Sequence, residues 1–557
     1  MTSLPPPRMH ALLRALALAV LLAGHHLTVA PARAATLGEA LAQLLASGTG
    51  VAASEQHEAG LALLTRFYRE RRMAPLWVTP AGAAARGAEL VAVLQAIGQD
   101  GLDREDYEAG ALATLLAARE AHRLAALEVR LSLALLKVAA DLAAGRLEPS
   151  KVDPEHFIYP DEVDRAEVIR AAAEAHDIGA FVAGFRPAQD EYRRLRAALA
   201  DLRAAAAMSW PRVAGGPTLD PGVRHARVGQ LRARLRATAD LPPEVAGGAG
   251  AADPDLYDAT LLAAVKRFQA RHGLEPDGRV GSRTLAALNV PVESRIRQVM
   301  LNLERRRWMP DQLGERHVFV NLADFHAKVV VGPKTVFDTR VVVGAPYHRT
   351  PVFSAEMTYV VINPYWYVPP GIARNELLPK IRQDPGYLSA HRFEVLSDWS
   401  DNAALLDAHA IDWKLVSADG FPYQLRQKPG PGNALGRIKL MFPNRFNVYM
   451  HDTPARALFE ENVRSFSHGC IRVERPEELG AVVLGQQPEW SLDRIRAAID
   501  SGQRRIVTLI EPLPVHITYL TAWVNKDGSV HFRDDVYGRD ARLAAALFPP
   551  PSPDAAE

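Results

Sequence analysis

The chain has 557 residues, and Lys plus Arg exceed Asp plus Glu by one, 65 against 64. This length exceeds what one hydrophobic core supports, so we expect several domains of roughly 100 to 200 residues each. A net charge of +1 provides no overall positive field, which argues against a nucleic-acid-binding protein. The abundance of Ala, together with 40 Pro and 38 Gly, favours helical domains joined by loops.

The N-terminal residues are typical of an export signal. The apolar run ALLRALALAVLLAG lies close to Arg8 and Arg14, and the small residues Ala32 and Ala34 follow it. The run is shorter than the about 20 residues that a membrane-spanning helix needs, and we find no later apolar run of about 18 residues or more. We therefore expect a signal peptide over residues 1–34 and a periplasmic location. A short buried helix or an uncleaved anchor is the alternative.

Residues 35–215 have helical periodicity. The stretch VRLSLALLKVAADLAAGRLEP predicts a helix that ends at Gly145, with Pro149 just beyond it. A second helix is expected to begin near Pro187, because apolar side chains then recur every three or four residues. These residues predict a helical scaffold domain.

Residues 222–290 predict a small three-helix module. One helix ends at Gly273, the turn EPDGRVG follows, and Ser282 is expected to cap a short closing helix. The stretch AVKRFQARHGLEPDGRVGSRTLAAL resembles the peptidoglycan-binding three-helix module, and this resemblance implies binding to the bacterial cell wall. A helical spacer without a ligand is the alternative.

The hydrophobic period changes to two near His317, which predicts a mainly-β domain. Runs such as HVFVNLADFHAKVVV and MTYVVINPYWYVPP are β-branched and aromatic, and Gly, Pro, Asn and Asp separate them. Aromatic, Pro-rich and helical pieces interrupt the strands and suggest a lid over a cleft. The expected boundaries are 291–315 for a connecting helix, 316–512 for the mainly-β domain, 364–432 for the lid insertion, and 513–557 for a C-terminal segment with a hairpin.

Cys470 is the only cysteine of the chain. In an exported protein a lone cysteine is an inert buried thiol, an intermolecular bridge or a reactive nucleophile. A thiol attacks as its thiolate and needs a neighbouring imidazole or positive dipole. His451 follows the alternating NVYM, so it can lie near a strand end and act as the base. His468 lies two residues before the cysteine and is better suited to shaping the turn.

The backbone near Cys470 is a candidate for oxyanion binding. Gly469 allows a close turn, so the N–H groups of Gly469 and Cys470 could point at an oxyanion. Asp452 adjoins His451 but points to the opposite face of a strand, so we expect a backbone carbonyl to orient the imidazole. The third member of a triad stays open.

Arg472 lies two residues after the cysteine and shares its face. Its guanidinium could bind a substrate carboxylate, or it could form a structural salt bridge with Glu474 or Glu477.

The segment HDTPARALFEENVRSFSHGCIRV closely resembles the catalytic signature of the L,D-transpeptidases. The stretches RQKPGPGNALGRIKLMFPN and VINPYWYVPPGIA and the order of domains extend the resemblance to the large multidomain members. It implies that Cys470 is the acylated nucleophile and that His451 accepts its proton, without a metal or another cofactor. The residues that fall on the motif are His451, Ser467, His468, Gly469, Cys470 and Arg472.

The resemblance also implies the substrate and the reaction. The cysteine would attack a peptidoglycan tetrapeptide stem, release the terminal D-alanine and pass the acyl group to a diamino-acid amine, which gives a 3→3 cross-link. Cell-wall synthases and carboxypeptidases are the expected protein partners. The residues expected to contact the substrate are Arg472, Ser467, Tyr449, Trp366 and Tyr365; the two insertion aromatics are alternatively hydrophobic core.

Two other functions remain open at the level of the sequence. His451, Asp452, His468 and Cys470 are acceptable zinc ligands for a metallopeptidase, although the spacing of His468 and Cys470 is tighter than usual. The chain could also be a non-catalytic wall-binding scaffold in which the cysteine is inert.

Overall fold

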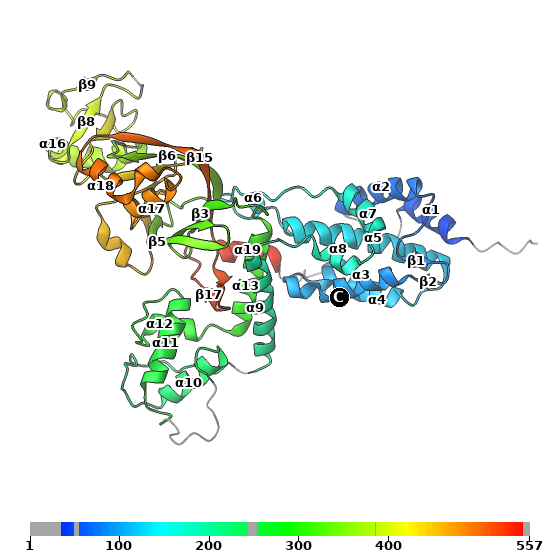
Figure 1. Cartoon of the computed structure of the whole chain (residues 1–557). Coiled ribbons are helices and arrows are strands. Elements are labelled where there is room, and N and C mark those ends of the chain that lie inside the picture. Colours follow the sequence, from blue (N-terminus) through cyan, green and yellow to red (C-terminus); the bar gives the residue numbers. More distant parts are fainter. Residues whose placement is uncertain are drawn as a thin grey trace, which may run out of the picture.

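The computed structural model describes residues 35–48, 55–208, 210–242, 253–384, 386–400 and 402–549. The expected signal peptide, residues 1–34, lies outside this part of the chain. Three lobes meet near the centre of the molecule: scaffold helices on the right, a small helical module below, and a β domain with its insertion at the upper left (Figure 1). No helix within the described ranges is long and apolar enough to cross a membrane.

The scaffold lobe is built around one long buried helix, α5 (Ala121–Ala144). This helix is apolar on most of its circumference, so other helices cover it on several sides. It ends before Gly145, which has φ 85°, as the sequence predicts. The other elements of the lobe are α1 (Leu37–Ser47), α2 (Glu55–Glu70), β1 (Val78–Thr79), β2 (Gly82–Ala83), α3 (Ala85–Ala96), η1 (Ile97–Asp100), η2 (Arg104–Tyr107), α4 (Ala109–Leu115), α7 (Arg165–Glu174) and α8 (Ile178–Ala183).

A central stalk joins the lobes. Helix α9 (Asp190–Ala206) packs on α13 (Val292–Arg307) and on the hairpin of β16 (Ala522–Val524) and β17 (Val530–Phe532). The last of the expected scaffold residues therefore belong to this stalk, because the apolar stripe of α9 is buried against the C-terminal hairpin. Helices α6 (Pro149–Val152) and α19 (Arg539–Leu547) pack nearby.

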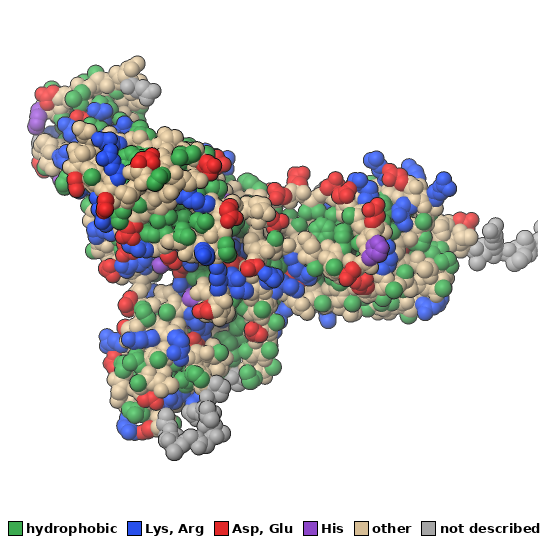
Figure 2. Space-filling view, viewed as in Figure 1, with side chains coloured by type: hydrophobic (Ala, Val, Ile, Leu, Met, Phe, Trp, Pro, Cys, Tyr) green, Lys and Arg blue, Asp and Glu red, His purple; other side chains and the backbone are tan. Residues whose placement is uncertain are grey.

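The module below the stalk contains α10 (Arg227–Ala237), α11 (Ala259–Arg271) and α12 (Ser282–Leu288) around a small apolar core. Gly273 has φ 66° and ends α11, as predicted. Ser282 is the first helical residue of α12, not its cap; Gly281 occupies the cap position, and no side chain caps the helix. Lys and Arg side chains alternate with Asp and Glu over the face of the molecule in Figure 2, in keeping with the small net charge.

The β domain has a nine-stranded sheet in the order β13-β5-β14-β12-β11-β6-β15-β3-β4, and β4 also pairs with β5, so the sheet closes on itself. Helices α17 (Pro476–Val483) and α18 (Leu492–Asp500) pack against β11 and β6. The strands are β3 (Arg316–Asn321), β4 (His326–Val331), β5 (Lys334–Gly344), β6 (Phe353–Ile362), β11 (Ile438–Met441), β12 (Met450–His451), β13 (Ser465–Ser467), β14 (Ile471–Val473) and β15 (Arg505–Thr518); η5 (Arg456–Glu460) and η6 (Pro488–Trp490) connect them.

The insertion between β6 and β11 folds around a core of its own. Its four-stranded sheet has the order β7-β10-β8-β9. The insertion forms the far end of the β lobe in Figure 1. Its elements are β7 (Trp366–Tyr367), α14 (Pro370–Ile372), η3 (Ala373–Leu377), α15 (Leu378–Gln383), α16 (Tyr387–Ala390), β8 (Phe393–Leu396), β9 (Leu405–Leu406), η4 (Ala408–Ala410) and β10 (Gln424–Gln427).

The expected end of the β domain at residue 512 is wrong. Strand β15 continues to Thr518 and pairs with both β6 and β3 beyond that point. The register shifts between Thr508 and Leu513, so Pro512 lies at an irregularity within the strand and does not end it. The expected fold class, a helical scaffold and a three-helix module followed by a mainly-β domain, is confirmed.

Candidate active site

Two short parallel strands position the cysteine and the histidine. β12 pairs with β14 so that Met450 lies beside Ile471 and His451 lies beside Arg472. Met450 and Ile471 are buried in the core of the sheet. Because side chains alternate along a strand, Tyr449, His451, Cys470 and Arg472 share the opposite face. These four side chains come from two segments that are nineteen residues or more apart, and the pairing register brings the segments together.

The Cys470 thiol is half-buried at the start of β14. Its Sγ lies 3.7 Å from the carbonyl oxygen of Asn447. Burial raises the pKa of this thiol, while Tyr449, Lys439 and Arg472 act in the opposite direction. The resting residue is therefore a thiol, and its attack on a carbonyl requires a base that takes the proton.

His451 has the properties of such a base. Its Nδ1 lies 2.5 Å from the main-chain oxygen of Asp452, so Nδ1–H donates and Nε2 keeps its lone pair. Burial, and then the charge of Arg472, lower the pKa of His451 to about 3, so the imidazole is neutral near pH 7. The carboxylate of Asp452 instead accepts the N–H groups of Arg437 and Thr453, at 2.8 and 2.7 Å. A backbone carbonyl orients the imidazole, as the strand alternation predicts.

The turn before the cysteine differs from the expectation in two respects. Ser467 is buried, and its Oγ donates to the Cys470 carbonyl at 2.5 Å and accepts the Gly469 N–H at 3.1 Å. The Ser467 hydroxyl is therefore occupied within the turn and is not placed to bind a substrate. The Gly469 N–H is likewise occupied, which leaves the Cys470 N–H as the candidate oxyanion donor of the pair.

Gly469 is required by the backbone of this turn. It has φ 108°, a region that residues with a Cβ rarely adopt. Its carbonyl accepts the hydroxyl of Thr350 at 2.8 Å, and the Thr350 oxygen accepts the Gly344 N–H at 2.9 Å. Thr350 is fully buried. The turn before Cys470 is thus held at the end of β5 by Thr350, which the sequence analysis missed.

The His468 side chain points toward the insertion, so it is not placed to act as the base for Cys470. Its Nε2 lies 2.7 Å from Oε1 of Glu376, which belongs to the π-helical turn η3. The His468 ring also lies 5.0 Å from the ring of His348, between centroids. His468 therefore links the turn before Cys470 to the insertion, and its expected part in shaping the turn stays a prediction.

Arg472 does not form either expected salt bridge. Glu474 pairs with Arg340, and Glu477 pairs with Arg496 at 3.1 Å. Within the described part of the chain Nε of Arg472 is buried without a hydrogen-bond partner, and burial lowers the pKa of the guanidinium. The geometry leaves this cation available for an anion beside Cys470.

Lys439 is a further member of this face that the sequence analysis missed. It pairs with His451 across β11 and β12, and its Nζ lies 3.8 Å from the ring centroid of Tyr449. Burial lowers the pKa of Lys439 to about 8. The alternation in RIKLM shows that Lys439 points away from the core, but only the strand pairing reveals that it faces His451.

Of the two insertion aromatics, Trp366 begins β7 of the small sheet, and Tyr365 directly precedes this strand. Trp366 packs against the apolar core of the insertion, 6.0 Å from the ring of Phe393. Tyr365 lies under the guanidinium of Arg426, 4.9 Å from its ring centroid. Trp366 thus follows the alternative of hydrophobic core, and a substrate contact of Tyr365 stays a prediction.

Comparison with known proteins identifies the domains. Residues 315–496 match the family model described as the L,D-transpeptidase catalytic domain. The chain therefore contains an L,D-transpeptidase catalytic domain. Residues 62–199 match a scaffold domain, and residues 224–288 match a domain described as "Putative peptidoglycan binding domain".

One curated relative shares this L,D-transpeptidase similarity. It is named "Putative L,D-transpeptidase", comes from Haemophilus influenzae and is 32% identical over 255 residues, which are 46% of this chain and 50% of the relative. The chain thus spans half the length of that relative.

Solved structures are more distant. An L,D-transpeptidase from Mycobacterium smegmatis is 13% identical, with a TM-score of 0.17, over 37% of this chain and 58% of that one. An L,D-transpeptidase from Xylanimonas cellulosilytica is 14% identical, with a TM-score of 0.18, over 55% of this chain and 98% of that one.

Proposed function

We propose that this protein is a peptidoglycan L,D-transpeptidase in which Cys470 is the acylated nucleophile. The observation that carries the proposal is the shared face of β12 and β14, where Cys470, a neutral His451 and Arg472 lie together, and Nε of Arg472 has no hydrogen-bond partner among the described residues. The match of residues 315–496 to the L,D-transpeptidase catalytic domain supports it.

In the first step the sulfur of Cys470 attacks the amide carbonyl between the diamino acid and the terminal D-alanine of a tetrapeptide stem. Nε2 of His451 takes the thiol proton as the bond from sulfur to carbon forms. The Cys470 N–H is the nearest candidate to bind the developing oxyanion. The C–N bond then breaks, the proton passes from His451 to the leaving amine, and D-alanine departs from a thioester.

In the second step an amine replaces the sulfur. The side-chain amine of a diamino acid in another stem loses a proton to His451 and attacks the thioester carbonyl. A C–N bond forms, the C–S bond breaks, and Cys470 regains a proton. The product is a 3→3 cross-link. Exclusion of water by the insertion would favour the amine over hydrolysis.

Arg472 and Lys439 are the groups of the site that suit an anionic substrate. D-alanine at the end of the stem carries a carboxylate, and a guanidinium binds a carboxylate through two parallel hydrogen bonds. A carboxylate bound there would balance the two cations that lower the pKa of His451, so substrate binding would make His451 a stronger base.

Several parts of the proposal concern the cell. An exported chain with a signal peptide over residues 1–34 would act in the periplasm, where peptidoglycan lies, and the module would hold the enzyme on the wall. The insertion would act as a lid, because Glu376 contacts the catalytic turn through His468. Synthases and carboxypeptidases would supply the tetrapeptide stems.

The donor geometry does not favour the zinc-dependent alternative. The carboxylate of Asp452 is occupied by two main-chain N–H groups, and Nε2 of His468 faces Glu376. In the described part of the chain no three His, Cys, Asp or Glu side chains are grouped as metal ligands. The non-catalytic alternative would assign no function to the neutral imidazole of His451 or to the guanidinium of Arg472 beside Cys470.

Intact-protein mass spectrometry tests the proposal. With a disaccharide-tetrapeptide as donor, the mass should increase by the stem without its D-alanine, and free D-alanine should appear. The Cys470→Ala variant should show neither change. A wild-type protein that releases no D-alanine and gains no mass would leave the non-catalytic scaffold as the better account.

A further inference from the structure

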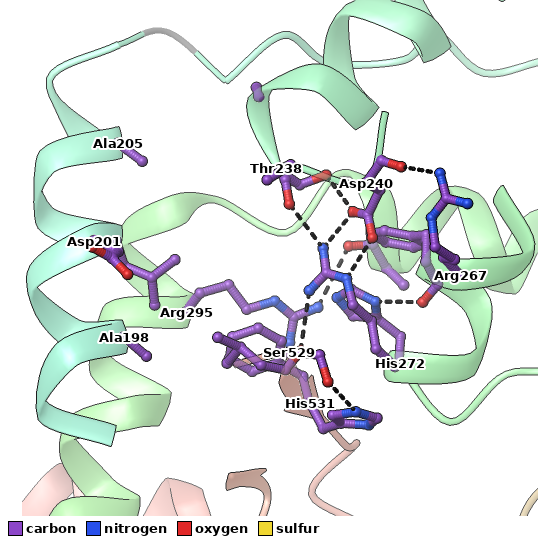
Figure 3. Close-up of a pocket in the computed structure, with 18 of the residues that line it drawn as sticks. Ala198, Asp201, Ala205, Thr238, Asp240, Arg267, His272, Arg295, Ser529 and His531 are labelled. Carbon is purple, nitrogen blue, oxygen red and sulfur yellow. Dashed lines mark hydrogen bonds and ion pairs between the residues drawn. The ribbon is translucent and has the colours of Figure 1, made fainter. Parts of the chain in front are cut away.

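A cavity lies away from Cys470, where the module meets the central stalk. Its volume is about 660 Å³, and residues of α9, α10, α11, α13 and the β16–β17 hairpin line it (Figure 3). No residue of the shared catalytic face lines this cavity. Its size falls within the about 300 to 1,000 Å³ typical of small-molecule sites.

Four arginines line the cavity: Arg234, Arg267, Arg271 and Arg295. Asp240, which is labelled in Figure 3, neutralises Arg271 through two contacts of 2.6 and 2.5 Å. Asp201 and Asp527 also line the cavity, but both side chains are exposed to solvent. The buried carboxylate of Asp240 therefore balances one of the four cations.

Two of these arginines are buried and have no carboxylate partner within the described residues. Arg234 is 2% exposed and donates to the Val290 carbonyl at 2.7 Å, and its Nε has no partner. Arg295 is 9% exposed and donates to the side chain of Gln298 at 2.8 Å.

Aromatic rings complete the surroundings of both cations. The guanidinium of Arg234 lies 4.3 Å from the ring of Trp210, and that of Arg295 lies 4.6 Å from the ring of Phe532. Burial lowers the pKa of each guanidinium to about 10, and the charge of Arg271 adds to the effect, while Asp240 acts in the opposite direction on Arg234 and Asp534 on Arg295. Neither carboxylate forms an ion pair with these two arginines among the described residues, and a buried cation without a direct ion pair is costly, so the two positions favour an anionic partner.

We propose that this cavity binds a carboxylate-bearing peptide stem of peptidoglycan, with Arg234 and Arg295 as the carboxylate-binding residues. The inference rests on the proposed function for the choice of polymer. It places a wall-binding site at the junction of the module, α9 and the C-terminal hairpin, so the module alone does not contain the whole site. A stem bound there would also hold the module against the stalk.

The test uses the full chain with Cys470→Ala, so that the probe is not turned over. The probe is a disaccharide-tetrapeptide with free carboxylates, and its counterpart has every carboxylate amidated. Hydrogen exchange measured by mass spectrometry reports residues 238–240 and 527–532 separately from the catalytic turn. The acidic probe should protect these two segments. Amidation should raise the probe concentration that gives half-maximal protection by at least tenfold.

Variants then assign the effect to the two arginines. R234Q combined with R295Q should weaken protection of both segments at least tenfold and leave protection around residue 470 unchanged. Arg279→Gln is the matched control, because Arg279 is an exposed arginine of the same module that pairs with Asp220. Thermal melting shows whether each variant folds, and R295K, which keeps the charge, should retain most of the binding.

Two results would overturn the inference: equal protection by the amidated probe, which needs no variant, or unchanged protection in the folded double variant. Neither depends on acyl transfer. Protection of the cavity in Cys470→Ala, combined with a wild-type protein that forms no Cys470 adduct with the same donor, would refute the proposed enzyme and retain this site.

Discussion

Replacing Lys439 by Met tests how a neighbouring cation controls the pKa of the Cys470 thiol. Lys439 is cationic below its pKa of about 8, and its charge opposes the rise in the pKa of Cys470 that burial causes. Removal of an opposite charge at short range raises a pKa by about 1 to 3 units. We use the lower end because the thiol is half-buried, so the thiolate fraction near pH 7 should fall about tenfold, which corresponds to about 1.4 kcal/mol.

The assay is alkylation by iodoacetamide, followed by intact mass as a function of pH. Since Cys470 is the only cysteine, each adduct reports this residue alone. The variant should react about tenfold more slowly below pH 8, and the two profiles should converge above it as Lys439 of the wild type loses its proton. Lys334→Met is the control, because Lys334 is an exposed lysine on β5. Superimposable profiles for wild type and Lys439→Met would refute the coupling.

Three further predictions concern the base, the turn and the insertion. His451→Gln should slow acylation of Cys470 about 10²- to 10⁴-fold without loss of folding, measured by intact mass over time; an unchanged rate would remove His451 as the base. Thr350→Val should destabilise the β domain by about 1–3 kcal/mol, because it leaves the buried carbonyl of Gly469 and the N–H of Gly344 unpaired. Chemical denaturation measures this loss, and a stability equal to that of the wild type would contradict the prediction. Glu376→Gln should change stability by less than about 1 kcal/mol, since both partners of the His468 pair are more than 40% exposed, but should increase hydrogen exchange in η3; unchanged exchange would show that this contact does not hold the insertion.

The sequence predicts the architecture well where periodicity is strong. The helix ending at Gly145 and the module helix ending at Gly273 both follow from a glycine in the left-handed region after an apolar stripe. The expected boundary at residue 512 is wrong because β15 continues past a register shift between Thr508 and Leu513 and ends at Thr518. Prolines are tolerated at such irregularities.

The candidate site was predictable in its residue types and less so in its contacts. The alternation along NVYM correctly places His451 and Cys470 on one face, because the period of a strand is two. The hydrogen bonds of Ser467 depend on the geometry of the turn, which the sequence pattern does not predict. The position of Lys439 opposite His451 depends on the strand register, which the sequence pattern does not predict either. The charged cavity at the stalk likewise joins α9, α11 and a hairpin that are far apart in the chain.

Analysis of muropeptides tests the central claim most directly. Sacculi rich in tetrapeptide stems are incubated with the wild type and, separately, with a folded Cys470→Ala variant, then digested and separated. The account predicts 3→3 dimers and free D-alanine with the wild type and neither with the variant. Equal amounts of 3→3 dimers with both proteins, or none with either, would contradict it.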